Sequence, residues 1–162
     1  MSTFDILEQR LNNTGLATAP FKNAAQAVSH LGAVQAQEFG PAKWALGLRV
    51  KNSTDKDIEE AFNKGLILRT HVMRPTWHFV LPEDISWMLE LTAPGVKKKI
   101  AHFHRQLNFD KKLFDTTNDA IFKALRGHTY LTSQELKKVD KSAGIKTDAL
   151  GHINIIMWAE LE

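Results

Sequence analysis

The sequence predicts a mainly α-helical fold with one small β-hairpin, arranged as two modules over residues 1–82 and 83–162. Apolar residues recur at helical spacing behind capping residues through most of the chain. The stretch ILRTHVMRPTWHFVLP breaks this pattern, because it is rich in β-branched and aromatic residues. Strand-forming residues on both sides of Arg74-Pro75 predict a hairpin between about Leu66 and Leu81.

Four short helices are predicted before the hairpin, and each has a residue that favours a helix start. The second is expected to end near Gly32, and the third to follow a turn at Gly40-Pro41. The fourth, DKDIEEAF, carries acidic residues in its first turn, where the helix dipole is positive. The four start signals are Thr3, Asn23, Pro41 and Thr54.

The chain is predicted to be helical again after the hairpin. A break at Thr92 and Pro94 is expected to separate the next helix from one over 94–106. Later helices are expected at 117–126, behind a capping box that begins at Thr132, and in the closing LGHINIIMWAELE. No hairpin follows these helices, so we expect the chain to be a fragment of a longer protein.

Short helices followed by a hairpin are the element order of a winged helix. The predicted fold is therefore tandem winged-helix (helix-turn-helix-like) modules, of which the second is truncated. In such a module one helix can enter a DNA groove while the hairpin touches the backbone beside it. A helical domain with a structural β-ribbon would give the same pattern, and the pattern alone leaves both interpretations open.

The composition is that of an ordinary globular protein, with 43% hydrophobic residues and a net charge of +3. The chain has no cysteine, which excludes disulfides and cysteine-based metal sites. The opening MSTFDILEQR lacks the apolar core of a signal peptide, and no apolar run approaches the roughly 20 residues of a membrane span. We expect a cytoplasmic protein without a membrane partner, whose basic charge permits a polyanionic one.

The stretch LGAVQAQEFGPAKWALGLRV sets Gln35 and Gln37 among apolar and small residues, which is unusual for glutamine. On a helix, side chains two residues apart diverge, whereas in an extended segment they point the same way. We expect residues 33–37 to be extended and to aim both amides at one point. The alternative is that the amides satisfy backbone groups at a helix end. After the turn at Gly40-Pro41, the apolar residues expected to be packed in the core are Trp44, Leu46 and Leu48.

The predicted helix over 94–106 combines an apolar stripe with six basic residues on its other faces. Such a charge run is either a solvated face or a contact for phosphate, to which each Lys or Arg adds salt-dependent affinity. The stripe consists of Val96, Ile100, Phe103 and Leu107. The basic residues are Lys97, Lys98, Lys99, His102, His104 and Arg105.

Other candidate sites are weaker. None of the seven histidines has a partner at metal-ligand spacing, so no metal site is predicted. Without a Gly-rich phosphate loop or a Gly-x-Ser-x-Gly elbow, phosphoryl transfer and triad hydrolysis are unsupported. On the hairpin, Arg69, Arg74 and His78 could face the hollow that holds the glutamines. Trp77 and Phe79 would then lie on the other hairpin face, in the core.

Four stretches of the chain match a known family: LGAVQAQEFGPAKWALGLR, ILRTHVMRPTWHFVLPEDISWMLELTAP, LTSQEL and LGHINIIMWAELE. In these stretches the chain resembles the winged-helix DNA glycosylases of the AlkZ/YcaQ type, and the resemblance covers essentially the whole chain. In that family a Gln-x-Gln or Gln-x-Asp motif carries catalysis, and Gln35 and Gln37 occupy its positions. Family members continue into a C-terminal β-rich part that is absent from this sequence. We therefore expect activity from the full-length protein and not from the 162-residue chain alone.

The resemblance implies a monofunctional DNA repair glycosylase, nucleoid-associated, that acts on damaged double-stranded DNA without a cofactor. Its reaction would hydrolyse the N-glycosidic bond of alkylated bases, with bulky or crosslinked lesions included. The implied catalytic residues are Gln35 and Gln37, which would position water. The implied DNA-binding residues are Arg69, Arg74, His78, Lys97, Lys98, Lys99 and Arg105.

Two alternatives to the glycosylase are kept. A non-catalytic winged-helix DNA-binding protein, such as a regulator, would read sequence through the helix over 55–63. The acidic start of that helix counts against groove reading. A helical module for protein contacts would instead have no affinity for nucleic acid.

Overall fold

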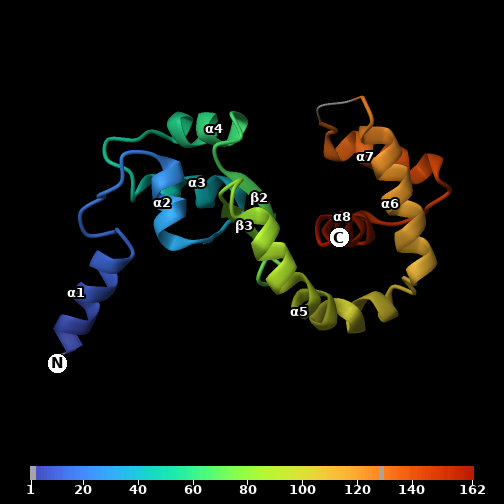
Figure 1. Ribbon diagram of the computed structural model, residues 1–162, viewed down its shortest axis with the longest axis horizontal. Coiled ribbons are helices and arrows are strands. Elements are labelled where there is room, and N and C mark those ends of the chain that lie inside the picture. The colour runs from blue at the N-terminus through green and yellow to red at the C-terminus, as the bar shows by residue number, and fades with distance from the viewer. Residues whose placement is uncertain (1–2, 128–129) are drawn as a thin grey trace. The chain divides into compact units, whose positions relative to one another are not determined.

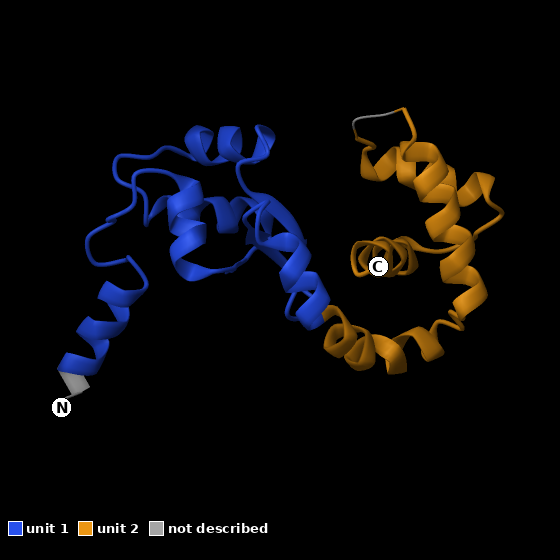
Figure 2. Cartoon of the chain, in the orientation of Figure 1, with its two compact units in different colours: residues 1–92 blue, residues 93–162 orange. Residues whose placement is uncertain are grey.

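The computed structural model describes residues 3–127 and 130–162, and over these residues it contains eight α-helices and three short strands. The chain forms two compact units, 1–92 and 93–162, which Figure 2 shows in different colours. The boundary lies inside a helix, somewhat after the one expected at 82. In the described part of the chain, no helix is both long and apolar enough to cross a membrane.

Unit 1 contains four helices, a small sheet and the start of a fifth helix (Figure 1). The mainly helical prediction is confirmed, and so is the hairpin expected between Leu66 and Leu81. The elements are α1 (Thr3–Asn13), α2 (Ala24–Leu31), β1 (Val34–Gln35), α3 (Phe39–Gly47), α4 (Asp55–Asn63), β2 (Leu68–His71), β3 (Trp77–Val80) and α5 (Ile85–Gln106).

The sheet is antiparallel, with the strand order β1-β3-β2. The hairpin places Thr70 of β2 opposite His78 of β3. On its other edge β3 pairs with β1, where Val34 lies opposite Phe79 and Gln35 lies opposite His78. Of the segment predicted to be extended, 33–37, residues Val34–Gln35 form the third strand, because the edge of β3 offers unpaired N–H and C=O groups.

Both faces of the central strand β3 are covered. Phe79 is fully buried among the helices of unit 1, with its ring 6.1 Å from that of Phe39 and 6.3 Å from that of Phe62. On the opposite face Val80 packs with Met88 at the start of α5. A shift of one residue would exchange the two faces, so this double burial fixes the register of the strand.

Several helix ends follow the predicted signals. The side chain of Asn23 accepts a hydrogen bond from the backbone of Gln26 at 2.9 Å, and Gly32, with a φ of 74°, closes α2. Capping boxes start α4 at Thr54 and α7 at Thr132. These local contacts satisfy backbone donors that the first turn of a helix leaves unpaired.

Several local predictions were wrong. The helix expected at 117–126 begins earlier, at Lys111, because the side chain of Asp110 caps it by accepting from the backbone N–H of Leu113 at 2.8 Å. Pro41 lies in the first turn of α3 and not in a turn before it, at a position where its missing N–H removes no helical hydrogen bond. The expected break near Pro94 does not occur, because α5 continues through it. Trp44 and Leu48 are exposed while Leu46 is fully buried. Residues two apart on a helix diverge, so the three cannot share one buried face.

Unit 2 contains the remainder of α5 and three further helices, α6 (Lys111–Leu125), α7 (Ser133–Ser142) and α8 (Ala149–Glu160). As predicted, the stripe on α5 is buried at Val96 and Ile100. His104 was predicted on a solvated face but is buried, with its ring 4.8 Å from Phe114 and 5.5 Å from Trp158. An imidazole has an apolar body, and this aromatic cluster accommodates it.

Phe79→Ala is expected to destabilise unit 1 by about 3–5 kcal/mol, because it removes a buried ring and leaves a cavity beside Phe39 and Phe62. Urea unfolding followed by circular dichroism measures the change. The matched control is Phe122→Ala. Phe122 is 62% exposed, so its truncation should change the free energy of unfolding by no more than about 0.5 kcal/mol. Equal losses in the two variants would contradict a sheet anchored by this ring cluster.

Candidate functional site

Gln35 and Gln37 are both exposed; Gln35 ends β1, and Gln37 lies two residues further on, in the bend before α3. Ala36, between them, is fully buried in the core of unit 1. This alternation of exposed and buried residues is that of extended backbone, in which side chains at i and i+2 lie on one side. The buried alanine therefore holds the segment while the two amides face solvent.

The two amide oxygens contact the same short segment of the hairpin. Arg74, in the turn between β2 and β3, donates from Nη2 to Oε1 of Gln35 at 2.8 Å. The backbone N–H of Trp77 donates to Oε1 of Gln37 at 3.2 Å. A carbonyl oxygen has two lone pairs, so each amide oxygen retains an acceptor position after making one of these bonds. The pair carries no titratable proton and can act only by accepting or donating hydrogen bonds.

The backbone between the glutamines is held by a second arginine. Arg69 of β2 donates from Nε to the carbonyl oxygen of Ala36 at 2.8 Å and from Nη2 to that of Gln37 at 3.0 Å. Its guanidinium lies over the ring of Trp77, 4.4 Å from the ring centroid. The side chain is only partly exposed. The side chain of Arg69 thus binds the backbone of the glutamine segment, whereas the side chain of Arg74 binds a glutamine side chain.

His78, predicted to contact DNA, is 3% exposed and does not reach the surface. Its Nδ1 lies 2.8 Å from the carbonyl oxygen of Thr76, which can only accept, so Nδ1 carries the proton. Burial lowers the pKa of His78, and the neighbouring charge of Arg74 acts in the same direction. The prediction of a direct DNA contact is corrected to a packing position, because His78 lies on the same buried face of β3 as Val80.

The basic residues of α5 lie in unit 2 and differ in exposure. Lys98, Lys99 and Arg105 are exposed, and no ion pair is recorded for them within the described residues. Lys97 is partly buried: its ammonium lies 2.7 Å from a carboxylate oxygen of Glu162 and 4.8 Å from the ring centroid of Trp158. Three of the four predicted phosphate-binding cations on this helix are therefore available at the surface of unit 2.

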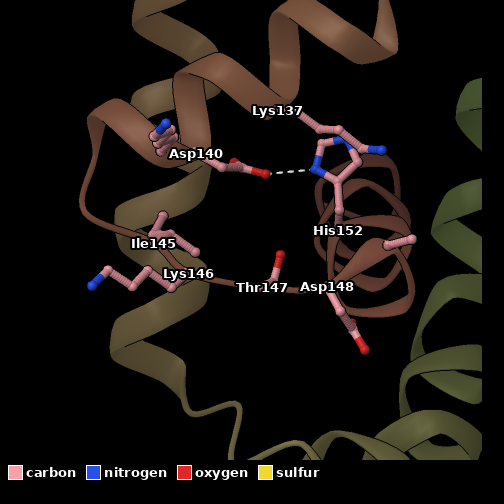
Figure 3. Close-up of a pocket in the computed structure, with 9 residues that line it drawn as sticks. Lys137, Asp140, Ile145, Lys146, Thr147, Asp148 and His152 are labelled. Carbon is pink, nitrogen blue, oxygen red and sulfur yellow. Dashed lines mark hydrogen bonds and ion pairs between the residues drawn. The ribbon is translucent and has the colours of Figure 1, made fainter.

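Unit 2 also contains a polar pair that the sequence analysis missed. Asp140 of α7 and His152 of α8 are both buried, with Oδ2 and Nδ1 2.6 Å apart, and they border a hollow lined by Lys137 and Thr147 (Figure 3). The contact joins two helices, so no local motif marks it. Across residues 3–127 and 130–162 there is no group of three His, Asp or Glu side chains placed to hold a metal ion.

Comparisons with known proteins identify the family of this chain. The sequence model of a family described as "DNA glycosylase AlkZ-like" matches residues 28–160. This chain belongs to the AlkZ-like DNA glycosylase family, as its resemblance predicts. No curated protein matches the sequence.

The solved structure of Streptomyces sahachiroi DNA glycosylase AlkZ is similar to this chain, with a TM-score of 0.74 and 22% sequence identity. The alignment covers 98% of this chain and 44% of that one, so this chain spans less than half the length of the solved structure. At this identity the likeness shows a shared fold.

The burial of His78 predicts a pH dependence. Its pKa is held below the ordinary value of 6.5. Below about pH 6.5, His78 therefore becomes protonated in the unfolded chain while it stays neutral in the folded protein. The contribution of neutral His78 to the free energy of unfolding is complete above that pH and is lost as the pH falls further. We expect the free energy of unfolding to decrease from about pH 7 to about pH 5, and His78→Gln to reduce this slope.

Urea unfolding at several pH values measures the slope. His102→Gln is the control, because His102 is exposed and its removal should leave the slope unchanged. A slope that is the same in wild type and His78→Gln would contradict a neutral, buried His78.

Proposed function

We propose that the full-length protein is a DNA glycosylase that removes cationic alkylated bases from double-stranded DNA, with Gln35 and Gln37 positioning the attacking water. The observation that carries the proposal is the convergence of two exposed amide oxygens on residues 74–77 of the hairpin. Membership of the AlkZ-like DNA glycosylase family supports it. A similar solved structure is itself named a DNA glycosylase.

The chemistry suits residues that cannot titrate. Alkylation of a purine ring nitrogen makes the base cationic, so the base leaves with the electron pair of the C1′–N bond and becomes neutral without acid assistance. The sugar then develops oxocarbenium character, and water adds at C1′ while its proton passes to solvent. An amide oxygen can hold that water through its free lone pair and can direct its dipole at the developing positive charge.

This mechanism restricts the substrates. Neutral bases are poor leaving groups and need general acid catalysis, which two amides do not supply. Cationic lesions, including bulky or crosslinked ones, fit the site. The reacting carbon is inaccessible within an intact stack, so the lesion must be flipped out or already exposed.

Exposed cations supply the proposed contacts with the DNA backbone. Arg74 lies in the hairpin turn beside Gln35, where a phosphate near the lesion could replace the amide oxygen as its acceptor. On α5 the exposed cations are Lys98, Lys99 and Arg105, and Lys97 would have to exchange Glu162 for a phosphate. Such contacts position DNA without reading its sequence.

One observation favours a second candidate, a non-catalytic winged-helix DNA-binding protein. The amide oxygen of Gln37 accepts a hydrogen bond from a backbone N–H, as it would in a purely structural role. Against sequence reading by α4, its carboxylates Asp55 and Glu59 face Lys43, whose pKa they raise by hydrogen bonding. An acidic helix is poorly suited to a DNA groove.

Gln37→Ala in the full-length protein is expected to slow base release by about 100-fold or more, because it removes a preorganised acceptor. Gln37→Asp should retain substantial activity, since a carboxylate keeps the acceptor and adds a favourable charge. Abasic sites in duplex DNA containing N7-methylguanine provide the measurement. Gln26→Ala, which alters an exposed glutamine near the start of α2, should react at the wild-type rate. If Gln35→Ala, Gln37→Ala protein reacts as fast as wild type, the motif is structural and the second candidate is favoured.

Charge reversal at Lys98, Lys99 and Arg105 is expected to weaken binding to undamaged duplex and to lower the slope of log affinity against log salt by about one per lost contact. Fluorescence anisotropy over a series of salt concentrations measures both. Lys138→Glu, which changes an exposed lysine of α7, is the control and should leave the slope unchanged. An unaltered slope after reversal on α5 would show that these residues form only a solvated face.

A further inference from the structure

We infer that Arg69 is a positioning residue for Gln37 and not a ligand of DNA phosphate. The inference rests on the proposed function, because its consequence is read out in base release. The guanidinium of Arg69 is already engaged by the carbonyl oxygens of Ala36 and Gln37, at 2.8 and 3.0 Å. The rings of Trp77 and Phe39 lie 4.4 and 5.9 Å from it. A guanidinium held by two carbonyl oxygens and two aromatic rings is poorly placed to bind a DNA phosphate.

The end of the β1–β3 ladder explains what Arg69 does. Continuing the register of β1 and β3 places Ala36 opposite Trp77. In an antiparallel ladder, two residues in a hydrogen-bonded pair exchange both N–H···O bonds. Here the N–H of Ala36 donates to the carbonyl oxygen of Trp77 at 2.7 Å. The reciprocal bond would run from the N–H of Trp77 to the carbonyl oxygen of Ala36.

Two side chains stand in for that reciprocal bond. The N–H of Trp77 donates to Oε1 of Gln37, at 3.2 Å. The carbonyl oxygen of Ala36 accepts from Nε of Arg69, at 2.8 Å. Arg69 therefore holds the carbonyl oxygen of Ala36 through one of its two lone pairs, and this bond takes the place of the ladder bond from the N–H of Trp77. By doing so it leaves this N–H to fix the orientation of the Gln37 side chain.

The arginine fork is suited to this task. Its Nε and Nη2 reach two successive carbonyl oxygens at once, and a charged donor makes a stronger hydrogen bond than the neutral N–H of Trp77. A lysine could occupy one of the two oxygens but not both in the same fixed geometry. Removal of Arg69 frees the carbonyl oxygen of Ala36, and the ladder can then close by one bond and release the Gln37 amide.

The test compares Arg69→Met and Arg69→Lys with wild type in the full-length protein. Single-turnover base release at saturating N7-methylguanine duplex should fall by about tenfold or more in Arg69→Met and by less in Arg69→Lys. Affinity for duplex and its salt slope should not change, whereas loss of a phosphate contact would lower the slope by about one. A lower slope with an unchanged rate would overturn the inference.

Arg49→Met is the matched control. Arg49 is also partly buried in unit 1, and it donates to two backbone carbonyl oxygens, those of Thr14 and Ala45, away from the glutamines. Loss of either arginine should lower stability, but loss of Arg49 should leave base release at the wild-type rate. Equal slowing in Arg49→Met and Arg69→Met would show that the effect is one of general stability.

Two further measurements separate failure of this inference from failure of the proposed function. If Arg69 acts through Gln37, Arg69→Met should slow the Gln37→Ala protein little further. The backbone amide signal of Trp77 in ¹H–¹⁵N spectra should move in each single variant and by less than their sum in the double variant. If Gln37→Ala leaves base release unchanged, the proposed function fails. The Trp77 signal then still tests whether Arg69 positions Gln37. Additive movements would overturn the role of Arg69.

Discussion

The pairing of β1 with β3 is the interaction on which the candidate site depends. β1 spans only Val34–Gln35, and so short a strand has little stability of its own. It is held because Ala36 and Phe79 are fully buried in the same core. The glutamines on either side of Ala36 therefore take their positions from the packing of unit 1, and a change deep in the core can displace them without touching them.

Local signals in the sequence predicted most of unit 1. Caps such as Asn23 and Thr54 act within a few residues, and the hairpin follows from the residues around Arg74-Pro75. The extended glutamine segment was predicted from side-chain periodicity. Its pairing with β3 was not, because nothing near Gln35 shows that its partner is His78. Contacts between residues distant in sequence leave no local pattern.

The surroundings of single histidines, lysines and arginines were also not predictable from the local sequence. His78 and His104 were assigned to surfaces, yet both are buried. Burial lowers the pKa of each, because the charged imidazolium loses its hydration. A neutral imidazole can pack as an apolar ring. Lys43, Lys97 and Arg69 are committed to partners within their units. Composition counts all of them toward a basic surface, but only the structure separates the exposed cations from those held by partners within their unit.

The same geometry gives the two glutamines different neighbours. Gln35 faces the exposed charge of Arg74, whose Nη2 lies 2.8 Å from its amide oxygen. A carboxylate there would form an ion pair that a DNA phosphate must break, whereas an amide makes a weaker bond that a phosphate can displace. Gln37 faces a neutral backbone N–H, so a carboxylate at that position would retain its free lone pairs and its charge. In the proposed reaction, an amide is therefore needed more at 35 than at 37, because the neighbour at 35 is a cation that must be released to bind DNA.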